Sequence, residues 1–498
     1  MRLQFLAAAT ALTLVLAGCA SSGGLHPDGT PLEPSALKAQ RSLAGQALTP
    51  AAWPAQNWWT GLDDPQLDAL IDEALAGNPG LAVVDARART AQAAAGVADA
   101  ARRPQLGLGA SVAGAKPPSG LLGDKAHFSV AKFGYLSFDW GPDPWGGKRA
   151  AWEAVLGQAR AAEVEARAAR IELSTNVARA YVQLGYAWTQ HDLAQAELER
   201  ARKARELTAQ RVRAGLDSQL QLKQGDAEVA SAEQQLAVAR RAIDAARTAL
   251  SVLLGKGPDR GLDIARPQPL APQALAVPAD LPVELLGHRA DLVAARWRVE
   301  AAGRDIAAAR TEFLPNVKLG AMAGLLAMGG NPLLRASSLF YQVGPSLSLP
   351  IFDGGRLRAN LAGKDAQYDL AVAQYNQTLV GALNEVADDY AAQQSLAEQV
   401  AAQQRALDAA HDAWRLAEQR YRAGVGSYLE ALSVRQQLLV AEQRMAALKA
   451  QQVDLSVQLI QALGGGYRPE NQASSGGYRP EAATGPQAAS SPSTPAHS

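Results

Sequence analysis

Gln210-Arg211-Val212-Arg213-Ala214-Gly215 recurs 209 positions later as Gln419-Arg420-Tyr421-Arg422-Ala423-Gly424. Earlier landmarks recur in the same order, because Leu81, Arg87, Pro104 and Leu108-Gly109 match Leu292, Arg298, Pro315 and Leu319-Gly320. Trp145-Gly146-Gly147-Lys148-Arg149 corresponds loosely to Phe352-Asp353-Gly354-Gly355-Arg356. Self-similarity at a fixed period indicates a repeated structural unit. We therefore predict a tandem duplication, with residues 77–275 as the first repeat and residues 285–464 as the second.

Each repeat predicts the same order of elements. An Ala-rich helix comes first, over about 79–102 and about 289–313, and each ends before a proline that cannot continue it. Apolar residues then alternate with small ones over 106–112 and 317–323, and again around 133–137 and 341–351, which is the period of β-strands. A helical run of about 65 residues follows, interrupted only at Gly215 or Gly424, and then a run of about 35 to 40.

The first long run of each repeat would extend roughly 100 Å as a helix, which is more than one globular domain encloses. We infer that this helix lines an elongated structure. Apolar stripes mark one face of these helices, and they would equally suit an ordinary coiled coil or bundle core. The stripes contain Leu173, Val177, Tyr181, Leu184 and Trp188 in the first repeat, and Leu438, Ala441, Met445, Leu448, Leu455 and Leu459 in the second.

The four predicted strands pose a closure problem if the sheet lies in a membrane. An open sheet edge there leaves backbone groups without hydrogen bonds, at several kcal/mol each. Four strands are too few for a closed barrel, since the smallest need about eight. A trimer would pool twelve strands and gather the long helices into a tube. The alternative from the residues alone is that the hairpins form a soluble sheet.

The N-terminus predicts export and lipid attachment. Arg2 precedes an apolar run too short to span a bilayer, so residues 1–18 are predicted to be a signal peptide. Leu16-Ala17-Gly18-Cys19 resembles a bacterial lipobox, which implies diacylglycerol and palmitate on Cys19; an ordinary signal peptide with an incidental cysteine is the alternative. Ala20 and Ser21 follow where an Asp would favour the inner membrane, so this resemblance implies the outer membrane. Cys19 is the only cysteine, so no intramolecular disulfide can form. We assign residues 19–76 to an anchor and equatorial segment.

The composition argues against enzymatic chemistry, a cofactor and nucleic acid. Lys and Arg together number 48, as do Asp and Glu, so no global charge attracts a polyanion. The six histidines show no metal-ligand spacing on one helix face, and no Gly-x-Ser-x-Gly motif occurs. Gly141 to Lys148 departs from the phosphate-binding loop, because Arg149 stands where Ser or Thr is needed. The tail, residues 465–498, is rich in Gly, Pro, Ser, Ala and Gln, and we predict that it is disordered.

These features together resemble the TolC/OprM family of outer-membrane efflux proteins, in particular its lipid-anchored, NodT-like branch. The most specific stretch runs from Leu286-Gly287-His288-Arg289-Ala290-Asp291-Leu292 to Phe313-Leu314-Pro315-Asn316. It is similar to the start of the family's second repeat, although Ala290 stands where proline is usual. Phe138-Asp139-Trp140 and Asp143 to Arg149 are similar to the family's junction between strand and helix. The likeness covers roughly residues 55–465.

The resemblance implies a mainly α-helical trimer with a twelve-stranded outer-membrane β-barrel and a twelve-helix periplasmic α-barrel. Such a channel is the passive exit of a tripartite efflux system, and its partners are a periplasmic adaptor and an inner-membrane pump of the resistance-nodulation-division or major-facilitator type. The sequence does not predict which compounds such a channel would transport. Two other classes remain as alternatives: a periplasmic coiled-coil adaptor, which predicts one helical hairpin and extensive soluble β domains, and a structural lipoprotein, which needs no trimer.

The two recurring hexapeptides mark the predicted functional tips. Gly215 and Gly424 each stand where a helix ends and reverses, which favours a residue that tolerates positive φ; a plain helix C-cap explains them in part. By resemblance, Glu430 occupies an acidic position of the closed aperture, although it could be a solvated charge, and Ser433 and Gln221 replace other expected acids. Tyr421 matches a tyrosine that latches the closed tip. The candidates for adaptor docking are Arg211, Arg213, Arg420 and Arg422, and surface charge would explain them about as well.

Overall fold

The computed structural model describes residues 22–38, 53–116, 128–272, 281–329 and 332–469. The predicted signal peptide and Cys19 lie outside the described residues. The chain divides into a large compact unit, Met1–Tyr467, and a second unit, Arg468–Ser498. Every described helix and strand belongs to the large unit. None of the described helices combines the length and the apolar character that crossing a membrane requires.

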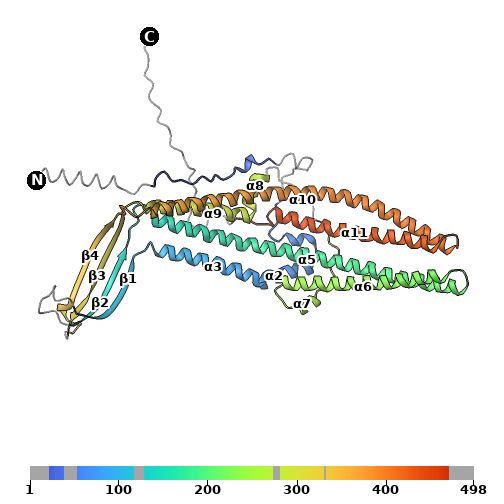
Figure 1. Ribbon diagram of the computed structural model, residues 1–498, viewed down its shortest axis with the longest axis horizontal. Helices are drawn as coiled ribbons and strands as arrows, with labels where there is room; N and C mark the ends of the chain where they lie inside the picture. The colour runs from blue at the N-terminus through green and yellow to red at the C-terminus, as the bar shows by residue number, and fades with distance from the viewer. Residues whose placement is uncertain (1–21, 39–52, 117–127, 273–280, 330–331, 470–498) are drawn as a thin grey trace, which may run out of the picture. The chain divides into compact units, whose positions relative to one another are not determined.

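Both repeats fold into the same succession of elements (Figure 1). The first contains α3 (Pro79–Ala100), β1 (Gln105–Ala115), β2 (Ser129–Trp140), α5 (Gly147–Arg213) and α6 (Gln219–Leu253). The second contains α9 (Ala290–Thr311), β3 (Asn316–Met328), β4 (Leu339–Ser348), α10 (Arg356–Arg422) and α11 (Tyr428–Ala462). The long helices have 67 residues in both repeats and the returning helices 35, so the predicted duplication and order of elements are confirmed.

Shorter elements connect and cover the repeats. They are η1 (Pro34–Ala36), η2 (Trp58–Leu62), α2 (Pro65–Gly77), α7 (Asp259–Leu262), α8 (Leu281–His288) and η4 (Ala336–Ser338). Helix α2 begins at Pro65 because the Asp64 carboxylate accepts hydrogen bonds from the backbone N–H groups of Gln66 and Leu67. Helix α3 begins in the same way, with Asn78 as cap and Pro79 in the first turn.

The four strands form one antiparallel sheet in the order β1-β2-β3-β4. The hairpin of each repeat was predicted, and the pairing of β2 with β3 joins the two repeats. Strands β1 and β4 are the two edges of this sheet. Pro345 lies in β4, where an edge strand tolerates a residue without an N–H group. The predicted alternation to Ile351 was too long, since β4 ends at Ser348, two residues before Pro350.

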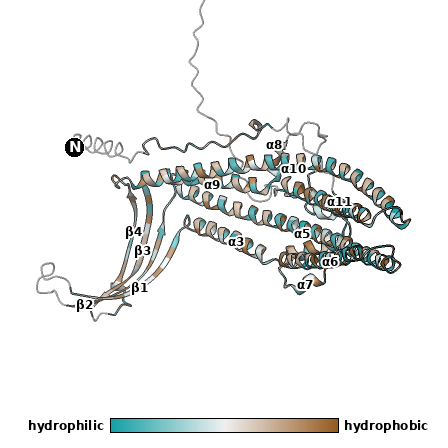
Figure 2. Cartoon of the chain, turned by 45° about the vertical axis from the view of Figure 1, so that its right-hand side comes forward, coloured by the Kyte–Doolittle hydropathy of each residue, from teal (hydrophilic) through white to brown (hydrophobic). Residues whose placement is uncertain are grey.

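The two faces of the sheet differ in chemistry, and apolar and polar residues alternate along the strands (Figure 2). The register places Leu108 opposite Leu136, Leu136 opposite Ala323, and Ala323 opposite Tyr341, so one face is apolar across all four strands. Leu108 is 85% exposed and Tyr341 80% exposed, so the described chain leaves most of this face uncovered, although Ala327 near one end is buried. The opposite face carries mainly glycine, serine and other polar residues, with a few large apolar ones.

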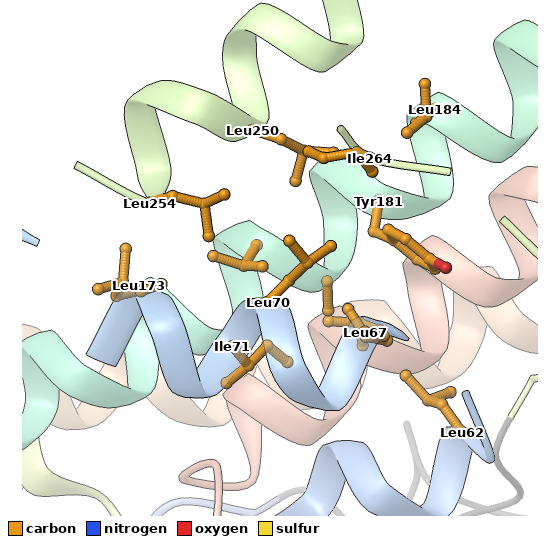
Figure 3. Close-up of a cluster of buried hydrophobic side chains, with 14 of the residues drawn as sticks. Leu62, Leu67, Leu70, Ile71, Leu173, Tyr181, Leu184, Leu250, Leu254 and Ile264 are labelled. Atoms are coloured by element: carbon orange, nitrogen blue, oxygen red, sulfur yellow. The ribbon is translucent and has the colours of Figure 1, made fainter. Parts of the chain in front are cut away.

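The largest core lies where α2 packs against α5, midway along that helix (Figure 3). Leu67 and Ile71 of α2 meet Leu184 of α5 and Leu250 of α6, all fully buried. Tyr181 is also fully buried, and its hydroxyl donates to the Asp64 carboxylate at 2.9 Å. A second core joins α9, α10 and the end of α11. Most residues of the predicted apolar stripes are buried, which confirms these stripes as helix-packing faces.

The predicted start of the disordered tail is too early. Gly464, Gly465 and Gly466 all have positive φ and turn the chain after α11. Tyr467 then packs, 5% exposed, in a cluster with Ala290. The packed chain therefore extends beyond residue 465, because three glycines allow a turn that returns an aromatic side chain to the core. Residues 470–498 lie outside the described part.

Candidate functional site

Each long helix ends in the same kind of turn. Gly215 has φ +72° and Gly424 has φ +77°, so the predicted left-handed conformation is present at both. The Leu216 N–H donates to the Arg211 carbonyl at 2.9 Å, and the Val425 N–H donates to the Arg420 carbonyl at 3.0 Å. These bonds close a Schellman motif in both repeats. The recurring hexapeptides are thus two equivalent helix reversals, which we call tip 1 (210–221) and tip 2 (419–430).

Each returning helix begins at a serine cap. The Ser218 N–H donates to the Gln221 side chain, which completes a capping box at tip 1. Gln221, which stands where the resemblance expected an acid, therefore serves helix α6 locally. At tip 2 the Ser427 hydroxyl oxygen accepts the Glu430 N–H at 3.0 Å. A β-carbon at Gly426 would lie 3.0 Å from the Arg420 side chain, so the tip 2 turn is tightly packed.

Asp217 fastens the two tips to each other. Its carboxylate accepts hydrogen bonds from Arg211 at 2.8 and 3.3 Å and from the Tyr421 hydroxyl at 3.2 Å. The Arg211 guanidinium lies 5.1 Å from the centre of the Tyr421 ring, within cation–π range. Hydrogen bonding to Asp217 raises the pKa of Arg211, and burial raises the pKa of Tyr421, so the cation and the donor hydroxyl both persist at neutral pH.

A second group of contacts joins the repeats further from the turns. The Tyr428 hydroxyl donates to Glu228 at 2.9 Å, and Arg200 reaches Glu228 at 3.1 Å and Glu197 at 2.6 Å. Arg435 donates to the other Glu197 oxygen at 2.8 Å. The Glu197 side chain is 9% exposed and that of Arg435 11%, so this ion pair is largely withdrawn from water. Burial raises the pKa of Tyr428, which therefore remains a donor.

Trp414 of α10 completes this group. The Arg200 guanidinium lies 6.0 Å and that of Arg435 5.9 Å from its ring. We call Glu197, Arg200, Glu228, Trp414, Tyr428 and Arg435 the inter-repeat cluster. It joins residues of α5, α6, α10 and α11, so the two hairpins of one chain are tied by charge as well as by apolar packing.

The structure separates the predicted docking arginines. Arg211 is engaged with Asp217 and its side chain is 23% exposed. Arg213 is exposed. Arg420 lies 3.9 Å from Glu430 and the side chains are 59% and 49% exposed, while Arg422 pairs with a glutamate one turn earlier and is 69% exposed. Three of the four arginines therefore present charge to solvent at the tips, and Glu430 lies beside them.

Sequence reasoning missed the most exposed apolar residues of the tips. Leu216 and Val425 are 68% and 70% exposed, and Leu220 and Leu429 are 68% and 62% exposed. The signal was available, because Leu216 matches Val425 and Leu220 matches Leu429 in the same 209-residue offset as the hexapeptides. Paired apolar residues at equivalent exposed positions of two turns indicate an interaction surface.

No group of three or more His, Cys, Asp or Glu side chains with metal-binding geometry occurs in the described ranges. The residues that the tips bring together are ion pairs, hydroxyl donors and exposed apolar side chains. Such groups can bind a protein partner and hold a conformation.

Comparison with known proteins agrees with this arrangement. The chain matches the family model described as "Outer membrane efflux protein" over residues 70–256 and 281–465. It is 38% identical over 365 residues to the fusaric acid resistance protein FusA of Burkholderia cepacia, which covers 72% of this chain and 69% of FusA. It is 32% identical over 472 residues to the multidrug resistance outer membrane protein MdtP of Escherichia coli strain K12, with 92% and 95% covered. The crystal structure of the outer membrane protein VceC of Vibrio cholerae superposes with a TM-score of 0.78 at 36% identity, over 83% of this chain and 100% of that one.

Proposed function

Since the chain belongs to the outer membrane efflux protein family, whose matched relatives are outer membrane proteins, we propose that it is the channel subunit of a tripartite efflux system. In this role it is a passive exit for drugs or small toxic compounds, delivered by an inner-membrane pump through a periplasmic adaptor. The pump supplies the energy, and the chain performs no enzymatic step. The observation that carries the proposal is the sheet, which has one face that is apolar across all four strands, except for Lys132 near one end, and which is unpaired at both edges.

The sheet supports a homotrimer. An uncovered apolar face stabilises the protein in lipid, where each unpaired backbone group costs several kcal/mol. Pairing β4 of one copy with β1 of the next removes both edges in every copy, and three copies supply twelve strands, enough for a closed barrel. Helix α5 follows β2 after a short turn, residues 141–146, and is roughly 100 Å long, so the same symmetry gathers the helices into a twelve-helix α-barrel in the periplasm.

The N-terminal segment supports lipid attachment at Cys19. The Gly29 N–H donates to Asp369 at 2.6 Å and the Leu32 N–H donates to Asn376 at 2.7 Å, so this segment follows α10. Leu25 packs in the cluster at the start of α10, close to where β4 ends. Cys19 precedes Ser22 by three residues, which span about 10 Å when extended. Acyl chains on Cys19 would therefore enter the bilayer beside the sheet.

The tips support docking of the adaptor. Leu216, Leu220, Val425 and Leu429 form two matched apolar pairs, and Arg213, Arg420 and Arg422 add exposed positive charge at the same tips. An adaptor that presents apolar side chains ringed by acidic ones would complement both repeats in the same way. Glu430 is the proposed aperture residue, and the contact of Tyr421 with Asp217 is the proposed latch.

The inner-membrane partner is of the resistance-nodulation-division or major-facilitator type. FusA is named for fusaric acid resistance and MdtP for multidrug resistance, so aromatic acids and drugs are the proposed cargo classes. The two alternative functions fit less well. A periplasmic adaptor was expected to have one helical hairpin and extensive soluble β domains, whereas this chain has two equivalent hairpins and one sheet with an uncovered apolar face.

Two measurements test the channel directly. The full-length protein, extracted in detergent, should migrate as a trimer on unheated gels and as a monomer after boiling. Reconstituted into planar lipid bilayers, it should produce discrete single-channel currents. A monomer before heating together with electrically silent bilayers would favour the structural lipoprotein instead.

A further inference from the structure

The face of the sheet opposite the apolar one carries an ordered row of rings and glycines. The register sets Gly109 of β1 beside Tyr135 of β2, and Tyr135 beside Gly324 of β3. Gly324 in turn lies beside Phe340 of β4. Glycine and aromatic residue therefore alternate across all four strands at one level. Phe133 lies two residues from Tyr135 on the same face, one step further from the helices.

The rings contact each other along β2 and from β2 to β4. The centroids of Phe133 and Tyr135 are 4.8 Å apart. Those of Phe133 and Phe340 are 5.2 Å apart with an interplanar angle of 17°, which is a stacked arrangement. All three side chains are half-buried. They form a continuous aromatic patch contributed by both repeats, which we call the aromatic belt.

The glycines allow the belt to lie close to the wall. A β-carbon at Gly109 would lie 2.5 Å from the Tyr135 ring, nearer than a real side chain can approach. A β-carbon at Gly324 would lie 2.3 Å from the Gly134 carbonyl oxygen and 2.8 Å from the Tyr135 β-carbon. The Tyr135 ring thus occupies the space that a side chain at Gly109 would fill, and Gly324 allows close approach of the neighbouring strand. The Tyr135 ring, which lies over Gly109, can present its π-face to whatever passes above it.

We propose that the aromatic belt of Phe133, Tyr135 and Phe340 lines the channel lumen and stacks with flat aromatic solutes as they leave the cell. This inference rests on the proposed trimeric barrel, in which the apolar face meets lipid and the glycine- and serine-rich face meets water. Three copies would place nine rings at two adjacent levels of the barrel, beyond the helices and near its outer end.

The surroundings of the belt favour neutral stacking over charge recognition. The charged residues of β2 and β3 on this face are Asp139 and Lys318, four residues from Tyr135 and six from Gly324 toward the helices. At 3.3 Å per residue these offsets are about 13 and 20 Å, beyond the range of screened charges in physiological salt. Aromatic rings attract other aromatic rings through offset stacking, whereas a saturated ring gains only area burial. The belt should therefore distinguish flat aromatic solutes from saturated solutes of equal size and charge.

The competing explanation is purely local. Aromatic side chains also cover glycines to stabilise a sheet, and then the rings would have no effect on solutes. The two explanations differ in what happens to a solute in the lumen. They agree that the rings contribute to the stability of the sheet, so stability alone cannot separate them.

The test uses the full-length protein in planar lipid bilayers, with naphthoate as the aromatic probe and decalin carboxylate as its fully saturated counterpart. Transient block of single-channel current gives a dwell time for each probe. Loss of two stacking contacts in the double variant Phe133→Leu and Phe340→Leu should shorten the naphthoate dwell time by about tenfold. The decalin carboxylate dwell time should stay within about twofold, since area burial is largely kept.

Phe138→Leu is the matched control, because Phe138 lies on the same strand as Phe133 but on the lipid-facing side. It should leave both dwell times unchanged. A second pair of variants keeps the rings: Gly109→Ala should tilt the Tyr135 ring into the lumen and lower the open-channel conductance. Gly344→Ala should not, because nothing lies within 4 Å of its added β-carbon.

Naphthoate dwell times that do not depend on Phe133 and Phe340, in channels of normal conductance, would overturn the belt and leave the channel intact. Equal shortening for both probes would also overturn it, because stacking would then not be the cause. Absence of any channel current from the unmodified protein would overturn the proposed function, and the belt with it.

Discussion

Replacing Glu197 by glutamine should loosen the two hairpins at the inter-repeat cluster. Glu197 accepts hydrogen bonds from Arg435 at 2.8 Å and from Arg200 at 2.6 Å, and its side chain is 9% exposed. Glutamine keeps the size but removes the charge, so Arg435 loses its main partner while it remains 11% exposed. Removing one partner of a buried ion pair costs about 3 to 5 kcal/mol. Because Arg435 retains a weaker contact with Glu442 at 3.4 Å, we expect the lower value, about 3 kcal/mol.

Hydrogen exchange of backbone amides measures this loss of local stability directly. A reduction of about 3 kcal/mol in the free energy of local opening corresponds to roughly a hundredfold faster exchange in α5 and α11 around the cluster. Exchange in the large core around Leu67 should not change. Glu233→Gln is the matched control, because its pair with Arg202 lies on the same hairpin but is 51% and 58% exposed. Such a pair contributes at most about 1 kcal/mol. Equal acceleration of amide exchange in both variants, or acceleration of less than about threefold in Glu197→Gln, would refute the reasoning. It would show that the buried ion pair does not stabilise the contact between the hairpins more than the exposed pair does.

Four further outcomes follow from the structure. Burial and two neighbouring acids raise the pKa of Asp389 from 3.8 to about 6, so the stability that its neutral form contributes is complete below pH 3.8 and is lost as pH rises through 6. Asp389→Asn should therefore stabilise the protein by about 1 to 2 kcal/mol at pH 8, after allowance for screening, and should not stabilise it at pH 3.5, as measured by thermal unfolding. Tyr421→Phe removes the hydrogen bond to the tip 1 carboxylate, about 1.5 kcal/mol, and should increase the open time of single channels. Leu108→Arg on the apolar face should reduce the heat-dissociable trimer at a cost of about 2 to 4 kcal/mol, whereas Ser346→Arg on the opposite face should not. Glu430→Gln should weaken block of the current by divalent cations, and unchanged block would remove Glu430 from the aperture.

Most of the helices, strands and turns could be predicted from the sequence, because the residue patterns that mark them are local. Prolines at 104 and 315 end the short helices, alternation marks the strands, and glycines at 215 and 424 allow the reversals. The sequence could not predict which strands pair across the repeats, since pairing of β2 with β3 depends on tertiary packing. The same limit hid the partner of Tyr421, because Asp217 lies 204 residues away and becomes its neighbour only when both hairpins are in place.

The residues that form the tip contacts differ between the two repeats. In the 209-residue offset, Asp217 has Gly426 as its counterpart, Tyr421 has Val212, and Arg435 has Asp226. In these three contacts near the tips, the first repeat therefore supplies the acids and the second supplies the donors, whereas further from the tips Arg179 of the first repeat donates to Asp454 of the second. Two like hairpins would place acid against acid, or leave donors without acceptors, and buried groups without partners are costly. These contacts therefore favour the pairing of a first-repeat hairpin with a second-repeat hairpin. A ring of six hairpins from three copies, as in the proposed trimer, requires first and second hairpins to alternate in this way.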